Sequence, residues 1–317
     1  MTRHFCTLFD KAFLARGLSL FDSLAKHCPD LMVWMLCMDN ESYDTLSKLN
    51  YRNITPLRLS EVEDAELLGV KSGRSNSEYC WMMSSSLPLF LLEKKGLNMI
   101  TYLDADMYFL GDVEEIFYEF GDNSIMIIPH WYADKNDPKL KLSGIYNVGM
   151  LIFRNDKNGL GCLHWWKNKC VEWCFARYED GKFGDQLYLN DWPERFEGVY
   201  VLKNHGANVA SWNIEGYEFF DKEHKLNLRV KNTNEHFPVI FYHYHGLKFF
   251  LTYAHKIKPY PVCILNGKMT RQVIIALEES YHKLWKIEPN WNYGFAPKLD
   301  ILRRIKQNIV LYFSKFN

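Results

Sequence analysis

The sequence predicts an α/β fold whose first hundred residues follow the pattern of a doubly wound sheet, and two features of the chain support this prediction. Strand and helix signals alternate over the first hundred residues, as they do where strands are joined by covering helices. The run Met99 to Leu103 is continuously apolar and is bounded by Gly96 and Gly111, which is typical of a strand covered on both faces. A chain of 317 residues with 48% hydrophobic content is large enough for such a core.

We take short apolar runs that end at turn residues as strands, and apolar side chains recurring every three or four positions as helices. The expected strands are His4 to Leu8, Met32 to Met38, Ile54 to Leu57, Met99 to Leu103, Ser124 to Pro129, Asn147 to Phe153, Tyr200 to Leu202 and Val239 to Tyr244. The expected helices are Arg16 to His27, Asn40 to Leu49, Glu78 to Lys95, Gly161 to Arg177, a short helix after Gly181 that carries Asp185 and Gln186, and a helical, basic region from Arg271 onward. Two segments between them are expected to be connections without helix or strand, Glu61 to Ser77 and Tyr132 to Ile145.

The domain organisation is expected to be simple, because no internal repeat or low-complexity linker divides the chain. We predict a catalytic domain over residues 1–265 and a helical, basic C-terminal extension over residues 266–317. In the extension, apolar residues recur at helical spacing from Leu299 to Phe313, with Arg303, Arg304 and Lys306 on the remaining faces. Such a helix suits either docking on the domain or lying on a membrane surface, and both alternatives stay open.

Composition excludes some function classes. Lysine plus arginine equals aspartate plus glutamate at 38 each, so no global charge indicates nucleic-acid binding. The chain start has no signal-peptide core, and no run reaches the roughly 18 to 20 apolar residues that span a bilayer, so we expect a cytoplasmic protein. Without export signals, its eight cysteines are expected to be reduced thiols. Cys170 and Cys174 lie near His164, but core packing is favoured over a zinc site.

A pair of carboxylates marks the candidate site. Asp104 and Asp106 come directly after the apolar strand that ends at Leu103. Residues two apart in an extended segment point the same way, so the two side chains can offer oxygens to one hard cation, Mg²⁺ or Mn²⁺. In open α/β sheets ligands bind beyond the carboxyl ends of the strands, which is where this pair is expected.

With this pair at a strand end, the chain resembles the GT-A nucleotide-sugar glycosyltransferases, and among them glycosyltransferase family 8. The resemblance covers roughly residues 4 to 250 and rests on motifs that occur in the family's order, which is more specific than any single motif. The matching segments are Phe5 to Asp10, Tyr102 to Asp106, Tyr146 to Met150, Gly184 to Gln186, and His243 to Gly246. One departure is that Lys248 follows Gly246 one residue earlier than the family's lysine does.

The resemblance implies a GT-A, Rossmann-like nucleotide-diphospho-sugar transferase fold, a divalent Mn²⁺ or Mg²⁺ ion and a UDP-linked sugar donor. The implied metal ligands are Asp104, Asp106 and His243, and His245 stays an alternative because it is two residues away on the same strand. Asp185 is implied to accept hydrogen bonds from the donor sugar, and Gln186 to lie near the anomeric carbon. The implied nucleotide and donor contacts are Thr7, Phe9, Asp10, Asp104, Ala105, Asn147, Gly246 and Lys248.

The implied function is transfer of a hexose, with retention of configuration, to a saccharide or glycolipid acceptor in polysaccharide or lipopolysaccharide synthesis. Further sugar contacts are expected from Asn208 and Asn213 and from loop aromatics, namely Trp131, Tyr132, Trp192, Trp212 and Trp291. Two alternatives remain, a sugar-nucleotide nucleotidyltransferase and a non-catalytic sugar- or lipid-binding protein. The first would need a Gly-rich phosphate loop after the first strand, and Leu8 to Lys11 is not one. A complete metal site argues against the second.

Overall fold

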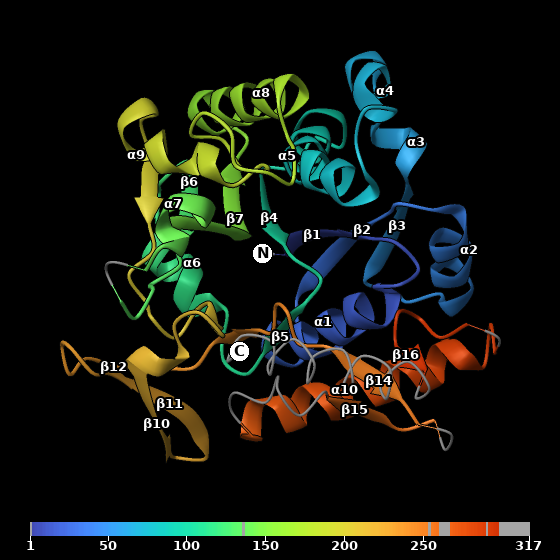
Figure 1. The fold of residues 1–317 in the computed structure, drawn as a ribbon, viewed down its shortest axis with the longest axis vertical. Helices are drawn as coiled ribbons and strands as arrows, with labels where there is room; N and C mark the ends of the chain where they lie inside the picture. The colour runs from blue at the N-terminus through green and yellow to red at the C-terminus, as the bar shows by residue number, and fades with distance from the viewer. Residues whose placement is uncertain (1, 135–136, 253–254, 260–266, 290, 298–317) are drawn as a thin grey trace, which may run out of the picture.

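The protein is described by a computed structural model over residues 2–134, 137–252, 255–259, 267–289 and 291–297. The predictions for Leu299 to Phe313 therefore lie outside the described residues. The fold is α/β: a seven-stranded sheet lies between α1 and α10 on one face and α5 and α8 on the other (Figure 1). The sheet has the order β3-β2-β1-β4-β7-β6-β8. Its strands are β1 Arg3–Phe9, β2 Leu31–Cys37, β3 Ile54–Arg58, β4 Met99–Leu103, β6 Ile125–Pro129, β7 Tyr146–Arg154 and β8 Val199–Val201.

The sheet is parallel over the first hundred residues, where the doubly wound pattern was predicted, and is mixed beyond them. Strands β3, β2, β1 and β4 are parallel neighbours, but β7 runs antiparallel to both β4 and β6. Because β7 is reversed, its first residues lie at the same edge as the carboxyl ends of β1 and β4. Three segments that are distant in sequence therefore meet at one edge of the sheet.

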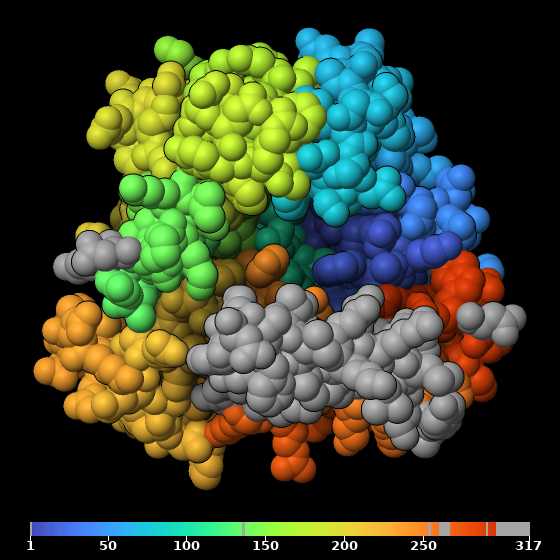
Figure 2. Space-filling model, in the orientation of Figure 1, coloured from blue at the N-terminus to red at the C-terminus, as the bar shows by residue number. Residues whose placement is uncertain are grey.

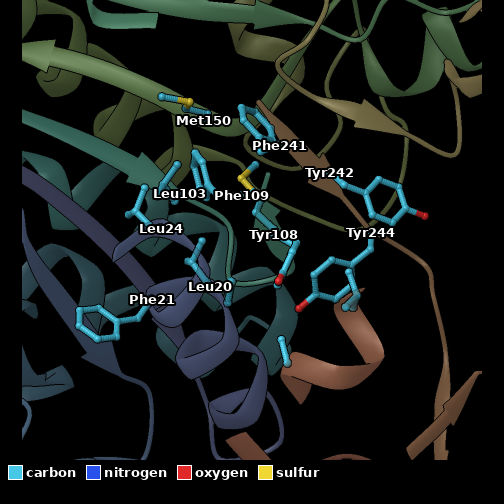
Figure 3. Close-up of a cluster of buried hydrophobic side chains, with 14 of the residues drawn as sticks. Leu20, Phe21, Leu24, Leu103, Tyr108, Phe109, Met150, Phe241, Tyr242 and Tyr244 are labelled. Atoms are coloured by element: carbon cyan, nitrogen blue, oxygen red, sulfur yellow. The ribbon is translucent and has the colours of Figure 1, made fainter. Parts of the chain in front are cut away.

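In the described part of the chain, three smaller sheets flank the main one. The first joins β5 (Met107–Phe109), β13 (Phe241–His243) and β9 (Val209–Ala210), and the second joins β10 (Tyr217–Lys222), β11 (Lys225–Val230) and β12 (His236–Pro238). The third joins β15 (Ile257–Pro259), β14 (Phe249–Leu251) and β16 (Ala296–Pro297). Figure 3 shows how α1 side chains and the β5–β13 strands share a buried cluster that includes Leu24, Phe109 and Phe241. The sheet that carries the end of β13 is therefore held firmly on the main core.

The helices are α1 Leu14–His27, α2 Asn40–Leu49, α3 Leu59–Val62, α4 Ala65–Lys71, α5 Asn76–Lys94, α6 Glu114–Phe120, α7 Lys139–Ser143, α8 Lys157–Glu172, α9 Trp192–Arg195 and α10 Gly267–Trp285, with 3₁₀ turns at Leu187–Asp191 and Ile214–Gly216. Helix α10 joins the core of α1, and Lys283 Nζ lies 2.8 Å from Asp22 Oδ2. The boundary at residue 266 stays a prediction. None of the helices in the described part of the chain is long and apolar enough to cross a membrane.

Most predicted elements are present within a few residues, and the errors have local causes. The expected connection Glu61 to Ser77 contains α4, whose N-cap Asp64 accepts a hydrogen bond from the Leu67 amide. The expected loop Tyr132 to Ile145 contains α7. Helix α8 begins four residues earlier than predicted, because Asp156 caps it, and ends at Glu172, where Trp173 turns to extended backbone.

The cysteine prediction is confirmed for the described residues. Cys170, on the buried face of α8, and Cys174, just after this helix, lie in the core, and the seven described cysteines are free thiols. His164 points elsewhere and lies 2.8 Å from Glu93 at the surface. This segment contributes packing, as expected for buried thiols.

Candidate active site

A cavity of about 650 Å³ opens at the sheet edge where β1 and β4 end and β7 begins. Figure 2 shows the hollow near the centre of this face, where dark blue, teal and green segments of the chain meet. Each wall is supplied by the end of a regular element, as is usual for ligand sites in α/β sheets. The lining residues from the predicted set are Phe9, Asp10, Asp104, Ala105, Asp106, Asn147, Asp185, Gln186, His243 and His245.

The carboxylate pair lies in a turn between β4 and β5, not in the extended segment that we predicted. The turn is fixed by its backbone: the Asp104 amide donates to the Gly149 carbonyl at 2.8 Å, and the Asp106 carbonyl accepts from the Tyr244 amide at 3.0 Å. These bonds attach the turn to β7 on one side and to the end of β13 on the other. The two carboxylates are therefore brought to one place by strand pairing, and not by the period of a strand.

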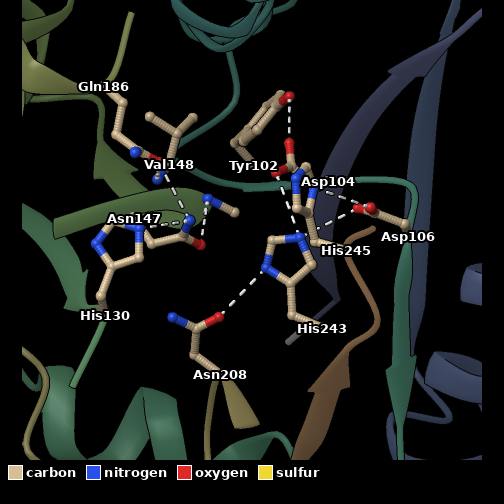
Figure 4. A network of polar contacts seen from close by, with 11 residues as sticks. Tyr102, Asp104, Asp106, His130, Asn147, Val148, Gln186, Asn208, His243 and His245 are labelled. Carbon is tan, nitrogen blue, oxygen red and sulfur yellow. Dashed lines mark hydrogen bonds and ion pairs between the residues drawn. The ribbon is translucent and has the colours of Figure 1, made fainter. Parts of the chain in front are cut away.

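Both carboxylates face His243. Its Nε2 lies 3.2 Å from Asp106 Oδ1 and 3.8 Å from Asp104 Oδ2, and His245 Nδ1 lies 3.5 Å from Asp106 Oδ2 (Figure 4). Ligand atoms of Asp106, His243 and His245 all lie within 4.8 Å of one another. Carboxylate oxygens and imidazole nitrogens at this spacing suit Mn²⁺ or Mg²⁺. The His245 side chain is 68% exposed while that of His243 is 2% exposed, so the two histidines differ in how far they are preorganised.

The electrostatics of the cluster favour an ionised acceptor at Asp106. Burial alone would raise its pKa, but His243 and His245 outweigh burial and lower the pKa of Asp106 well below its usual range. Asp104 differs, because burial and the nearby Asp106 raise its pKa against the opposing effect of His243. The Tyr102 hydroxyl donates a hydrogen bond to Asp104 Oδ1 at 3.0 Å and orients this second carboxylate.

Strand register places His243. In the small sheet, His243 pairs with Met107 on β5 and with Ala210 on β9. Its ring approaches β7 so closely that a Cβ on Gly149 would lie 2.9 Å from His243 Cε1, as well as 2.6 Å from Met107 Cε and closer still to Asn147 Oδ1. The absence of a side chain at Gly149 is therefore what allows the imidazole to lie against the strand.

We expect Gly149→Ala to displace the His243 ring and to weaken Mn²⁺ binding by roughly tenfold or more, in the range found when a ligand loses its support. The added methyl should also cost about 1–3 kcal/mol of folding free energy through overpacking. Mn²⁺ titration followed by electron paramagnetic resonance measures the affinity, and chemical denaturation measures the stability. Gly161→Ala is the matched control, because a Cβ there meets nothing within 4 Å. Unchanged Mn²⁺ affinity in Gly149→Ala would contradict this account.

Asp185 lies in the turn before the 3₁₀ helix Leu187–Asp191, and not inside a helix as predicted. Its Oδ2 is 2.6 Å from Ser84 Oγ on α5, and its carbonyl accepts from Trp166 Nε1 at 2.8 Å. Burial, with a smaller contribution from Asp104, raises the pKa of Asp185 to about 7, against the opposing bond from Ser84. The carboxyl group is thus held rigidly in a poorly solvated corner of the cavity, and its proton is easily gained or lost near neutral pH.

Gln186 is held by a chain of hydrogen bonds. Its Oε1 accepts from the Val148 amide at 3.3 Å and from Asn147 Nδ2 at 3.2 Å, while its Nε2 donates to the Ser143 carbonyl at 2.6 Å. Asn147 Nδ2 also lies 3.4 Å from His130 Nε2, and burial lowers the pKa of His130 to about 4. A neutral His130 can accept this bond, so every hydrogen bond in the series has a donor and an acceptor. It ties α7 to the start of β7.

Several predicted contacts do not line the cavity. Thr7 is fully buried within β1, and Gly246 and Lys248 are exposed beyond β13. Lys139 on α7 is a lysine that does line the cavity. The expectation that Asn208 and Asn213 contact sugar is not supported, because both are buried and bond within the protein. Among the loop aromatics, Tyr132 and Trp212 line the cavity. Trp192 is part of the hydrophobic core, and Trp131 and Trp291 are partly buried and pack against the core.

Sequence reasoning missed one wall of the cavity. Trp81, from the first turns of α5, lies with its ring centroid 6.1 Å from that of Phe183, and it packs against Gly184 next to Asp185. The capping box of Ser75 and Glu78 marks in the sequence where α5 begins, but only the structure shows that this helix start lines the cavity. Tyr102 could also have been found, because it lies two residues before Asp104 and points to the same side.

Comparison with known proteins gives relatives and a fold. No family model matches the chain. The uncharacterized protein YfnF of Bacillus subtilis is 33% identical over 318 residues, covering 95% of this chain and 99% of YfnF. YfnD of the same organism, also uncharacterized, is 28% identical over 306 residues, covering 94% of this chain and 96% of YfnD.

Among solved structures, the galactosyltransferase LgtC in complex with donor and acceptor sugar analogs superposes with a TM-score of 0.55 at 15% identity, covering 89% of this chain and 95% of LgtC. An active-site mutant of LgtC gives a TM-score of 0.53 at 16% identity, covering 85% of this chain and 94% of that chain. At this identity the likeness concerns the fold, which is the GT-A fold of glycosyltransferases. The predicted fold class is confirmed.

Proposed function

This chain belongs to the same family as YfnF of Bacillus subtilis, and we propose that it is a metal-dependent glycosyltransferase of the family 8 type. The observation that carries the proposal is the cluster of Asp104, Asp106 and His243 at the edge of the GT-A sheet, in one cavity with Asp185 and Gln186. The proposed reaction moves a hexose from a UDP-linked sugar to a saccharide or glycolipid acceptor in cell-surface polysaccharide or lipopolysaccharide synthesis, on the cytoplasmic side.

The proposed metal ligands are Asp104, Asp106 and His243, with His245 as a further candidate. A divalent ion held there would neutralise the charge that a diphosphate gains as it leaves. The chain's own contribution is a buried imidazole whose Nε2 lies 3.2 Å from an oxygen of Asp106 and 3.8 Å from an oxygen of Asp104. Phe9, Asp10 and Ala105 would then hold the nucleotide from β1 and the turn after β4, which is where nucleotides lie in such sheets.

Asp185 is proposed to accept hydrogen bonds from donor-sugar hydroxyls. The rings of Trp81 and Phe183 form the neighbouring wall, and aromatic rings of this kind pack against the apolar face of a sugar. A carboxylate beside an aromatic wall gives a pyranose both an acceptor and a stacking surface. This part of the cavity is accordingly assigned to the donor sugar.

Retention of configuration is proposed to proceed by attack on the face from which the diphosphate leaves. The carboxylates among the described lining residues are Asp10, Asp104, Asp106 and Asp185. Asp10 Oδ1 accepts from two amides of its own turn, the next two are metal ligands, and Asp185 is bonded to Ser84. The Gln186 Oε1 is occupied by two donors. This engagement supports a mechanism without a covalent nucleophile.

Thermal-shift titration tests the proposal, because a ligand that binds only the native state raises its stability by mass action. We expect UDP with Mn²⁺ to raise the melting temperature, whereas UDP alone, and GDP, ADP or CMP with Mn²⁺, should give small shifts. Saturation at 100 times Kd should stabilise the protein by about 2.7 kcal/mol. The Asp106→Asn variant is the control and should lose the Mn²⁺-dependent part. A folded wild-type protein that responds to no nucleotide would favour the alternative of a non-catalytic sugar- or lipid-binding protein.

A further inference from the structure

Asn208 is a buried residue whose geometry is fixed before any ligand arrives. It is 1% exposed and precedes β9 with a φ of +62°, a left-handed conformation that asparagine tolerates better than most residues. Its own carbonyl accepts a hydrogen bond from Asn213 Nδ2 at 2.9 Å. The parallel pairing of β9 with β13 places it beside the strand that carries His243. The backbone at this position is therefore set by its neighbours.

The orientation of the Asn208 amide follows from its two partners. Nδ2 donates to the Pro129 carbonyl at 3.2 Å, and a carbonyl oxygen can only accept, so the NH₂ group must face Pro129. The opposite end of the amide, Oδ1, then faces His243 Nδ1 at 3.3 Å (Figure 4). Reversing the amide would place two oxygens together at Pro129. The direction of the amide is therefore determined by chemistry.

The same logic extends to the histidine. An amide oxygen can only accept, so His243 Nδ1 must carry a proton to bond with Asn208 Oδ1. The other ring nitrogen, Nε2, points at Asp106 and Asp104. Trp212 packs edge-on to the ring at 5.2 Å and Gly149 lies against it; these contacts fix the ring plane without selecting which nitrogen carries the proton. Asp106 Oδ1 can only accept, so it favours a proton on Nε2 while no cation is bound. Asn208 Oδ1 is the acceptor that holds a proton on Nδ1, and this proton would remain when a cation takes the place of the one on Nε2.

We propose that Asn208 is a positioning residue that keeps His243 protonated on Nδ1, so that the lone pair on Nε2 is directed at the divalent cation. The proposal rests on the proposed function for its cation. A hydrogen bond to the second nitrogen of a ligating imidazole fixes the tautomer and the ring orientation and makes the ligand more basic. Asn208 acts through His243, because its Oδ1 accepts the hydrogen bond from His243 Nδ1.

Two variants separate this role from a purely structural one. Asn208→Gly suits the positive φ but removes the acceptor, and we expect Mn²⁺ affinity to fall by roughly 10- to 100-fold, the usual cost of losing such a partner. Asn208→Asp keeps an oxygen opposite His243 Nδ1 and places another opposite the Pro129 carbonyl. It should therefore lower the melting temperature yet retain Mn²⁺ affinity within about threefold. Electron paramagnetic resonance of free Mn²⁺ measures both affinities.

If Asn208 were purely structural, Mn²⁺ affinity would fall with the stability of the protein. The Asn208→Asp variant would then bind Mn²⁺ in the order set by stability, as weakly as the Asn208→Gly variant. That order, or wild-type affinity in Asn208→Gly, would overturn the proposal. Both variants should be compared with Gly161→Ala as a control for handling and folding.

The tautomer itself is measured on the metal-free wild-type protein by ¹⁵N–¹H correlation of the imidazole rings at pH 8, with the His243→Gln variant used to assign the signal. We expect Nδ1 of His243 to be protonated, and this signature to be lost in Asn208→Gly. An unprotonated Nδ1 in the wild type would overturn the proposal. This measurement needs no metal, so a wild-type protein that binds no Mn²⁺ would count against the proposed function, while the ring signal would still decide the role of Asn208.

Discussion

The Asp106→Asn variant should lose sugar transfer by roughly 10³-fold or more while keeping the fold. Both oxygens of Asp106 are used, Oδ1 toward His243 and Oδ2 toward His245, and an amide would replace one of them with an NH₂ group that cannot bind a cation. The size of the effect follows from the several kcal/mol that a bound metal contributes to stabilising developing charge. The measurement is the release of nucleoside diphosphate from the sugar nucleotide under saturating Mn²⁺, and circular dichroism reports whether the fold is kept.

The matched control is Asp122→Asn, which removes a carboxylate from an exposed turn and should leave turnover unchanged. The Asp106→Asn result is informative because the residue's backbone contact with Tyr244 does not depend on the side chain. Turnover within tenfold of wild type, with the same Mn²⁺ requirement, would remove Asp106 from the mechanism.

The strands and helices of the Rossmann-like half could be predicted because their signals are local. Residues Met99–Leu103 form β4 and residues Asn40–Leu49 form α2 with the predicted bounds. The reversal of β7 could not be predicted in this way. Its apolar run, like that of β4, indicates a buried strand, but strand direction is decided by how the chain returns to the sheet.

The candidate site could likewise be predicted only in part. Sequence motifs point to Asp104, Asp106 and His243. The structure brings these residues together through the pairing of β5 with β13, a contact between residues more than 130 positions apart. The sequence predicts a sugar contact for Asn208, because the composition of its loop does not indicate that the side chain is buried. Its partners Pro129 and His243 come from separate segments, and only the folded chain reveals them.

The Asp185→Asn variant should transfer sugar far more slowly than wild type and yet gain stability relative to wild type as the pH rises. The fold raises the pKa of this carboxyl from its ordinary 3.8 to about 7, so the native state keeps a proton that the unfolded chain releases near pH 4. Stability from this group is complete below pH 4 and is lost as the pH rises through 7. An asparagine does not ionise, so the stability of the variant relative to wild type should rise by about 1–3 kcal/mol between pH 5 and pH 8. Transfer should fall roughly 10²-fold, because a fixed acceptor for the sugar is weakened.

Urea unfolding of the metal-free proteins at pH 5 and pH 8 gives the stability difference, and the other titrating groups are common to both proteins and cancel. Asp191→Asn is the matched control: its carboxylate is six residues away and pairs with Arg195 at the surface, so its loss should cost less than about 1 kcal/mol. A stability gain in Asp185→Asn together with lost transfer would identify a carboxylate retained for binding at the expense of the fold. If the stability difference between the variant and wild type were instead the same at pH 5 and pH 8, the raised pKa of Asp185 would be refuted.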